Sequence, residues 1–140
     1  MKLQQAILQF YYDATLHELR LMNENTLYPD ISYHSLLYLD LIAYRENCTA
    51  SYLAQALHVS KPAVTAKINE LIAQGLVVKT QSRDDRRVNY ITLSEPMQAD
   101  YRSYDKRLQQ AAMVVKSRYT AEEIDTFVQM LGVIGKEYIK

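Results

Sequence analysis

Residues 49–76, TASYLAQALHVSKPAVTAKINELIAQGL, constrain the fold because they contain two helix starts close together. Thr49 and Ser60 each precede a run with helical apolar spacing, and their side-chain oxygens can accept a hydrogen bond from the first turn. The segment HVS between the two runs leaves room only for a tight turn. Gly75 is the expected left-handed stop of the second helix. Two short helices joined in this way form a helix-turn-helix motif.

The second helix of the motif is expected from Lys61 to Ala73. Pro62 fits its first turn, where a missing backbone N–H is tolerated. Apolar residues recur at helical spacing and predict the buried stripe, at Val64, Ile68, Leu71 and Ile72.

A β-hairpin is expected directly after this helix. The β-branched runs LVVKTQ, residues 76–81, and VNYITL, residues 88–93, flank the charged segment SRDDRR, residues 82–87. Such runs favour paired antiparallel strands. The charged segment would then form a loop that is longer than a tight hairpin turn requires.

The rest of the chain should be helical, because only three glycines and three prolines occur in 140 residues. Further helices are expected over about 3–22, 33–45, 95–118 and from 121 onwards, with a turn in NENTLYPD at residues 23–30. Their expected N-caps are Ser32, Ser94 and Thr120, the last in a capping box with Glu123. The fold class is therefore mainly α with a small β-hairpin, an α+β chain.

Charge is unevenly distributed, although 16 basic and 16 acidic side chains give no net charge. Residues 1–57 hold three basic and six acidic side chains, whereas residues 58–92 hold six basic and three acidic ones. A basic middle suits local contact with phosphates. The single cysteine, Cys48, cannot form an internal disulfide, and neither a leader peptide nor a membrane span is evident, so we expect a cytoplasmic protein.

Both ends of the chain carry apolar helical stripes that a compact helix-turn-helix core can cover only in part. A second copy of the chain is the simplest cover and predicts a homodimer. The alternative is that the terminal helices pack on each other within one chain.

The segment LAQALHVSKPAVTAKINELIAQGLVVKTQSRDDRRVNYITLSE resembles the multiple antibiotic resistance regulator (MarR) family of winged helix-turn-helix transcription factors. It matches the family's helix-turn-helix, glycine stop and wing, which ends in an Asp-x-Arg motif. The resemblance covers nearly the whole chain. It implies a single MarR-like domain over residues 1–140, with a DNA-binding lobe at 31–94 and dimerisation helices at 1–22 and 95–140.

The resemblance implies that helix 61–73 lies in the major groove of DNA. Side chains off the buried stripe are the ones free to face the groove, which admits one helix. Ser60 and Lys61, at the positive N-terminal end, suit a phosphate, whereas Thr65, Lys67 and Asn69 are candidates for base edges. The DNA-binding residues expected on this helix are Ser60, Lys61, Pro62, Thr65, Lys67 and Asn69.

The family's wing motif maps onto Asp85, Arg86 and Arg87. Arg87 matches the minor-groove reader and Asp85 the carboxylate that braces it, within a wing at 82–87. A planar guanidinium suits the negative potential of a narrow minor groove. Arg83 and Arg86 would then meet phosphates. The alternative is a solubilising hairpin tip whose exposed ion pairs contribute little to stability.

Two positions depart from the family pattern. Many members have Arg where this chain has Ala66, which can offer only a methyl contact to a thymine. Glu70 stands where a basic residue is common and lowers the local charge.

Other kinds of site have little support in the sequence. His17, His34 and His58 lack the spacing of a metal site, no catalytic constellation stands out, and we expect no cofactor and no enzyme activity. Relatives often bind small aromatic or phenolic ligands, and the tyrosines near the first two helices could line such a pocket or could simply fill helix interfaces. Those tyrosines are Tyr11, Tyr12, Tyr28, Tyr33, Tyr38 and Tyr44.

The function expected from this resemblance is that of a homodimeric repressor on a pseudo-palindromic operator of double-stranded DNA, with release by a small-molecule effector as a further expectation. A winged helix that binds a partner protein is the alternative. Cys48 lies outside the first helix, where some relatives place a peroxide-sensing cysteine, and its redox role stays open.

Overall fold

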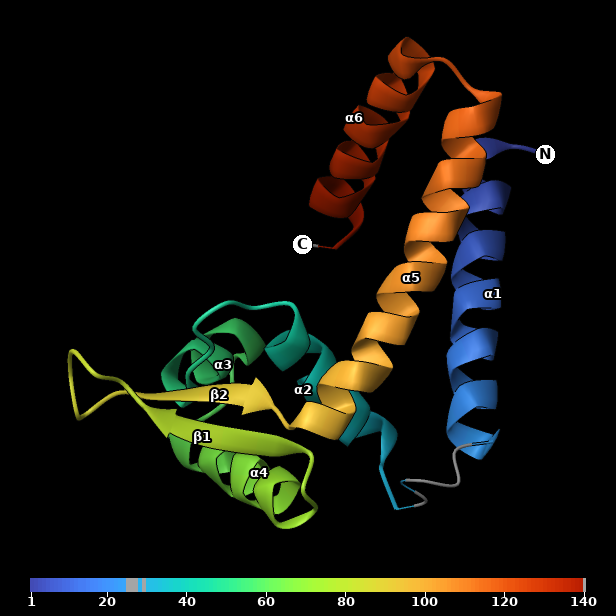
Figure 1. Cartoon of the computed structure of the whole chain (residues 1–140). Coiled ribbons are helices and arrows are strands. Elements are labelled where there is room, and N and C mark those ends of the chain that lie inside the picture. The colour runs from blue at the N-terminus through green and yellow to red at the C-terminus, as the bar shows by residue number, and fades with distance from the viewer. Residues whose placement is uncertain (25–27, 29, 140) are drawn as a thin grey trace. The chain divides into compact units, whose positions relative to one another are not determined.

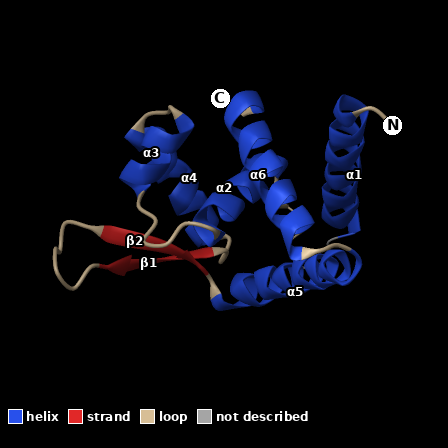
Figure 2. Cartoon of the chain, turned by 90° about the horizontal axis from the view of Figure 1, so that it is seen from above, coloured by secondary structure: helices blue, strands red, loops and turns tan. Residues whose placement is uncertain are grey.

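The computed structural model describes residues 1–24, 28 and 30–139. The chain forms two compact units, Met1–Ser94 and Glu95–Lys140, and the predicted mainly α fold with one β-hairpin is confirmed (Figure 2). The first unit holds α1 (Leu3–Glu24), α2 (Tyr33–Ala43), α3 (Ala50–Leu57), α4 (Lys61–Ala73), β1 (Val77–Gln81) and β2 (Asn89–Leu93); the second holds α5 (Glu95–Arg118) and α6 (Ala121–Tyr138) (Figure 1). Of the turn predicted over residues 23–30, residues 23 and 24 instead belong to α1, and residues 25–27 and 29 fall outside the described residues.

Hydrogen-bonded caps fix most helix starts where the sequence predicts them. The hydroxyls of Ser32, Thr49 and Ser60 each accept a backbone N–H from the first turn of α2, α3 and α4. Thr120 and Glu123 form the complete capping box at α6. These interactions are local, so a short stretch of sequence is sufficient to specify them.

The predicted cap at Ser94 is wrong. Helix α5 does begin at Glu95, but the buried Ser94 hydroxyl has no hydrogen-bond partner among the described residues. The backbone N–H of Ser94 donates to the carbonyl of Leu76 at 2.9 Å. Pairing with the chain beside β1 therefore holds Ser94 as an extension of the hairpin.

The core of the first unit lies between the helices and the hairpin. Helix α3 packs on α4, α2 and α3 contact β2, and α4 contacts β1. Each of these elements contributes fully buried side chains, among them Leu39, Leu53, Ile68, Leu71, Val77 and Ile91. Helix α2 contributes Tyr38, Leu39 and Ile42 to this core, although its Leu37 is exposed.

The hairpin is antiparallel, and its register runs from Val77 opposite Leu93 to Gln81 opposite Asn89. A third segment joins it, because the N–H of Ile91 donates to the carbonyl of Cys48 at 2.8 Å. The loop at residues 82–88 projects beyond α3 and α4 at the end of the hairpin in both views (Figures 1 and 2). Attachment to the core at one end thus leaves the other end free to reach a partner.

The left-handed stop at Gly75 connects α4 to the hairpin. Gly75 has φ +72°. Its N–H donates to the Ile72 carbonyl, and the N–H of Leu76 donates to the Leu71 carbonyl. This pair of bonds is a Schellman motif, in which the residue after the glycine makes an apolar contact. Leu76 is fully buried, so the stop also anchors the start of the hairpin.

Helices α1, α5 and α6 present many apolar side chains to solvent. No residue of α1 or α6 is buried, and exposed apolar residues include Phe10, Tyr12, Leu108, Met113, Phe127, Val128 and Leu131. Within the second unit, α5 and α6 contact each other. None of the helices in the described part of the chain is apolar over a length that would cross a bilayer.

Candidate nucleic-acid interface

Helix α4 is oriented by its buried stripe. Val64, Ile68 and Leu71 are almost completely buried, whereas Ile72 is only half-buried. The turn before the helix is tight because His58 adopts a left-handed conformation with φ 55°. The polar face of α4 is therefore directed away from the core.

The outward face of α4 forms a shallow, widely open surface hollow. Its lining consists of Lys61, Pro62, Thr65, Ala66 and Asn69, which lie one helical turn apart along one face. Four of the predicted DNA-binding residues are thus brought together with Ala66. Ser60 stands at the end of this face, where its hydroxyl accepts the Ala63 N–H at 3.3 Å.

Lys67, the one positively charged residue among the predicted base contacts, pairs with another residue of α4. Its Nζ donates to both carboxylate oxygens of Glu70 at 3.2 Å. Only 12% of the Lys67 side chain is exposed, against 51% for Glu70. The pair lies at i, i+3 spacing, which signals such an interaction in a sequence. A cation held in this way has to leave its partner before it can contact a base.

The wing loop, residues 82–88, is organised by Ser82. Its hydroxyl accepts the backbone N–H groups of Asp84 and Asp85 at 3.2 and 3.3 Å, and its own N–H donates to the Val88 carbonyl at 2.8 Å. Ser82 is buried. No role was predicted for its side chain, although a serine whose hydroxyl accepts backbone N–H groups just ahead in the chain is a known turn former.

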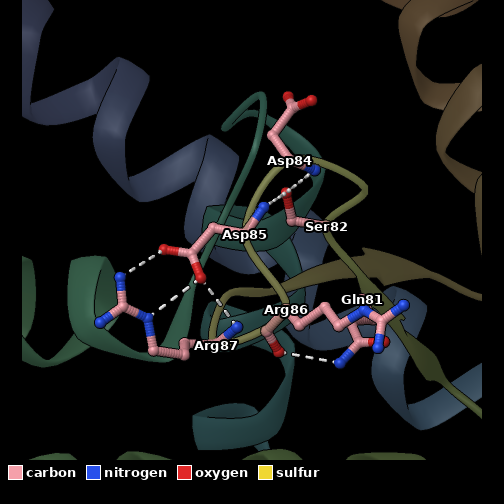
Figure 3. Close-up of polar contacts among 6 residues, drawn as sticks. All are labelled: Gln81, Ser82, Asp84, Asp85, Arg86 and Arg87. Atoms are coloured by element: carbon pink, nitrogen blue, oxygen red, sulfur yellow. Dashed lines mark hydrogen bonds and ion pairs between the residues drawn. The ribbon is translucent and has the colours of Figure 1, made fainter.

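Gln81 adds a second tie across the loop, since its Nε2 donates to the Arg86 carbonyl at 2.8 Å (Figure 3). This contact was not predicted either, because it depends on the path of the loop. Together, Gln81 and Ser82 fix both sides of the wing loop by hydrogen bonds to its backbone.

Asp85 and Arg87 form a compact pair at the tip. Arg87 donates to the Asp85 carboxylate through Nε at 3.1 Å, Nη2 at 3.2 Å and its backbone N–H at 3.0 Å (Figure 3). These hydrogen bonds, first from the guanidinium and then from the backbone, hold the pKa of Asp85 below its ordinary value. The Arg87 side chain nevertheless stays 90% exposed. The result is a guanidinium with a fixed direction and an open face.

The remaining charged residues of the loop point into solvent. Arg83, Asp84 and Arg86 are all exposed, and the side chains of Arg86 and Arg87 leave the loop in opposite directions (Figure 3). Three arginines are therefore accessible on one loop of the same unit as α4. The roles in DNA binding expected for Arg83, Asp85, Arg86 and Arg87 stay predictions.

The residues considered for other chemistry are dispersed. Cys48 is buried, and burial raises the pKa of its thiol, with Arg45 acting in the opposite direction. No group of three potential metal ligands comes together in the described residues. Among the tyrosines considered for a ligand pocket, only Tyr38 is buried, whereas Tyr11, Tyr12, Tyr33 and Tyr44 are exposed.

Known proteins resemble the chain in both sequence and fold. Residues 30–88 match the MarR family, and the Bacillus subtilis (strain 168) protein described as the uncharacterized HTH-type transcriptional regulator YwhA is 29% identical over 96 residues, which are 68% of this chain and 69% of YwhA. Streptococcus pneumoniae FabT in complex with DNA has a TM-score of 0.67 at 21% identity, with 97% of this chain and 96% of FabT covered. Staphylococcus aureus MarR in complex with salicylate and kanamycin has a TM-score of 0.57 at 20% identity, covering 98% and 93% of the two chains. Over residues 30–88, which include both helices of the helix-turn-helix and the wing loop, the chain is therefore similar to the MarR family of winged helix-turn-helix transcriptional regulators.

Proposed function

We propose that the chain is a cytoplasmic, homodimeric repressor that binds a pseudo-palindromic operator, with α4 in the major groove and the wing in the adjacent minor groove. The observation that carries this proposal is the braced Arg87 guanidinium, 90% exposed, on the same compact unit as the outward face of α4. The chain would act by binding and not by catalysis. Sequence-specific DNA is its proposed partner.

The chemistry of α4 fits a groove contact. The helix begins with a capped N-terminus, where unpaired backbone N–H groups and the positive end of the dipole favour a phosphate. Lys61 stands at that end, and Thr65 and Asn69 follow on the same exposed face. Hydroxyl and amide groups are the kinds of side-chain group that contact base edges in the major groove.

The wing chemistry fits the neighbouring minor groove. A narrow minor groove concentrates negative potential, and a guanidinium enters it with a modest loss of hydration. Arg87 is held in one direction by Asp85, so little side-chain freedom would be lost when it binds. Arg83 and Arg86 are exposed on the same loop and suit the flanking phosphates.

The proposed dimer would use α1, α5 and α6. These helices expose apolar side chains that would aggregate or bind unless a partner covers them, for example Phe10, Leu108 and Phe127. A two-fold axis would place two copies of α4 in major grooves about one DNA turn, roughly 10 base pairs, apart. An effector that changes this separation would release the DNA, and a small aromatic or phenolic compound is the proposed class, since the S. aureus MarR structure holds salicylate.

Fluorescence anisotropy with the DNA upstream of the chain's own coding sequence tests the proposal. The dissociation constant should rise steeply with salt, because phosphate contacts release bound cations. Arg87→Ala should weaken binding markedly at low salt, whereas a variant of Lys2, in another part of the chain, should not. Binding that is indifferent to salt and to Arg87 would instead indicate a winged helix that contacts a protein.

Sedimentation velocity at micromolar concentration tests the dimer independently. We expect a mass near twice that of the 16.2 kDa chain. A single species at the mass of one chain would contradict the proposed symmetry and, with it, the pseudo-palindromic operator.

A further inference from the structure

The outward face of α4 has apolar groups at its centre and polar groups at its ends. Pro62, Thr65 and Ala66 lie between Lys61 and Asn69 in the lining of the hollow. Pro62 and Ala66 are exposed, and Thr65 is half-buried. The central groups that a base could meet are therefore the proline ring, the alanine methyl and the threonine with its methyl and hydroxyl.

The polar ends of this face limit which bases can be read there. Lys61 belongs to the first turn, close to the expected path of a phosphate. The amide of Asn69 can form two hydrogen bonds with the edge of an adenine in the major groove. Guanine is usually contacted by a basic side chain that donates two hydrogen bonds. Lys67, the basic residue in the middle of α4, is paired with Glu70, and only 12% of its side chain is exposed.

The apolar centre has one natural counterpart in DNA. Among the base edges of the major groove, only thymine presents a methyl group, at C5. Alanine and the threonine methyl are typical contacts of that group. A face with methyl groups at its centre gains from a thymine and gains nothing comparable from a cytosine in the same place.

We infer that α4 selects its half-site mainly through thymine methyl groups, with Ala66 and Thr65 as the specificity-determining residues and Asn69 reading an adjacent adenine. This inference rests on the proposed DNA-binding function. It predicts that the half-site under the centre of α4 consists of A·T pairs. Removing one buried methyl group corresponds to a loss of roughly fourfold in affinity.

The test begins with duplexes that the full-length chain enriches from a random double-stranded library. An enriched duplex is then synthesised with deoxyuridine in place of thymidine, one position at a time, which removes the C5 methyl and keeps base pairing. For the parent chain, the dissociation constant should rise about fourfold at one or more half-site positions. Deoxyuridine placed outside the half-sites is the control and should have no effect.

Thr65→Ser and Ala66→Gly each remove one protein methyl group. The ratio of the deoxyuridine to the thymidine dissociation constant should fall toward one at the position that each residue contacts, and this ratio is independent of how stably the variant folds. A ratio near one for the parent chain at every position, or an enriched half-site with a central run of G·C pairs, would overturn the inference while leaving DNA binding intact. Failure to enrich any duplex would overturn the proposed function itself, and this inference with it.

Discussion

Replacing Asp85 with alanine should weaken DNA binding, even though the change removes a negative charge from the wing. Asp85 accepts three hydrogen bonds from Arg87, two of them from the guanidinium at 3.1 and 3.2 Å. Without the carboxylate, the exposed Arg87 side chain would sample many rotamers. Binding in the minor groove would then have to order it.

The size of this effect follows from two opposing contributions. The entropy cost of ordering one long side chain on binding typically raises the dissociation constant by roughly two- to tenfold. Loss of the carboxylate strengthens attraction to phosphates, but salt screens that gain. We therefore expect Asp85→Ala to lower the affinity for DNA by roughly threefold near 0.2 M salt, and we expect this loss of affinity to become smaller as the salt concentration is lowered.

Asp84→Ala provides the matched control. It removes the same charge from the same loop, but the contact seen for Asp84 there is its backbone N–H bond to Ser82, which alanine keeps. Asp84→Ala should tighten binding slightly at low salt. Thermal unfolding should be nearly unchanged for both variants, since exposed ion pairs contribute little to stability.

Fluorescence anisotropy on Asp85→Ala, Arg87→Ala and the double variant completes the measurement. If Asp85 acts through Arg87, its replacement should no longer weaken binding once Arg87 is alanine. Refutation would be an Asp85→Ala variant that binds more tightly at both salt concentrations by the same factor as Asp84→Ala. Asp85 would then contribute only its charge.

Three further predictions follow from local features of the structure. Gly75→Ala should lower the free energy of unfolding by about 1 kcal/mol in urea titrations, because an alanine at φ +72° is strained, whereas Gly132→Ala inside α6 should not destabilise the chain. Glu70→Gln should release its lysine and tighten binding to nonspecific DNA at low salt, with little change at high salt; no change at low salt would mean that the lysine cannot reach a phosphate. Hydrogen bonds donated by Thr120 hold the pKa of the Glu123 carboxyl below its ordinary value of 4.5. The stabilisation that the ionised carboxylate gives to α6 is therefore complete above pH 4.5 and is lost as the pH falls through the lowered pKa. Amide signals at the start of α6 should follow this change, and Glu123→Gln should abolish their pH dependence.

Local rules account for most of the fold that could be predicted. An N-cap involves residues within one turn, so Thr49, Ser60 and the Thr120 capping box were all found where short sequence patterns placed them. The same rule failed at Ser94, where a backbone bond to Leu76 holds the residue in the hairpin. That bond joins chain segments far apart in the sequence, and no local pattern contains it.

The candidate site shows the same division. The spacing of the buried stripe determined which face of α4 is exposed, so Lys61, Pro62, Thr65 and Asn69 could be grouped before the fold was known. The tie from Gln81 to the Arg86 carbonyl depends on the path of the wing loop. A residue type and a spacing identify a helix face, whereas a loop contact depends on the three-dimensional path of the chain.

Two carboxylates on this unit act on two cations with opposite results. Glu70 holds Lys67 with only 12% of its side chain exposed, whereas Asp85 holds Arg87 with 90% exposed. Each pair lowers the net positive charge, and with it the attraction to any DNA. Only the second pair leaves its cation exposed. The chain has no net charge, so overall electrostatic attraction would contribute little to its choice among DNA sequences. That choice would depend mainly on how well the oriented Arg87 guanidinium and the methyl groups of α4 fit the grooves of a given sequence.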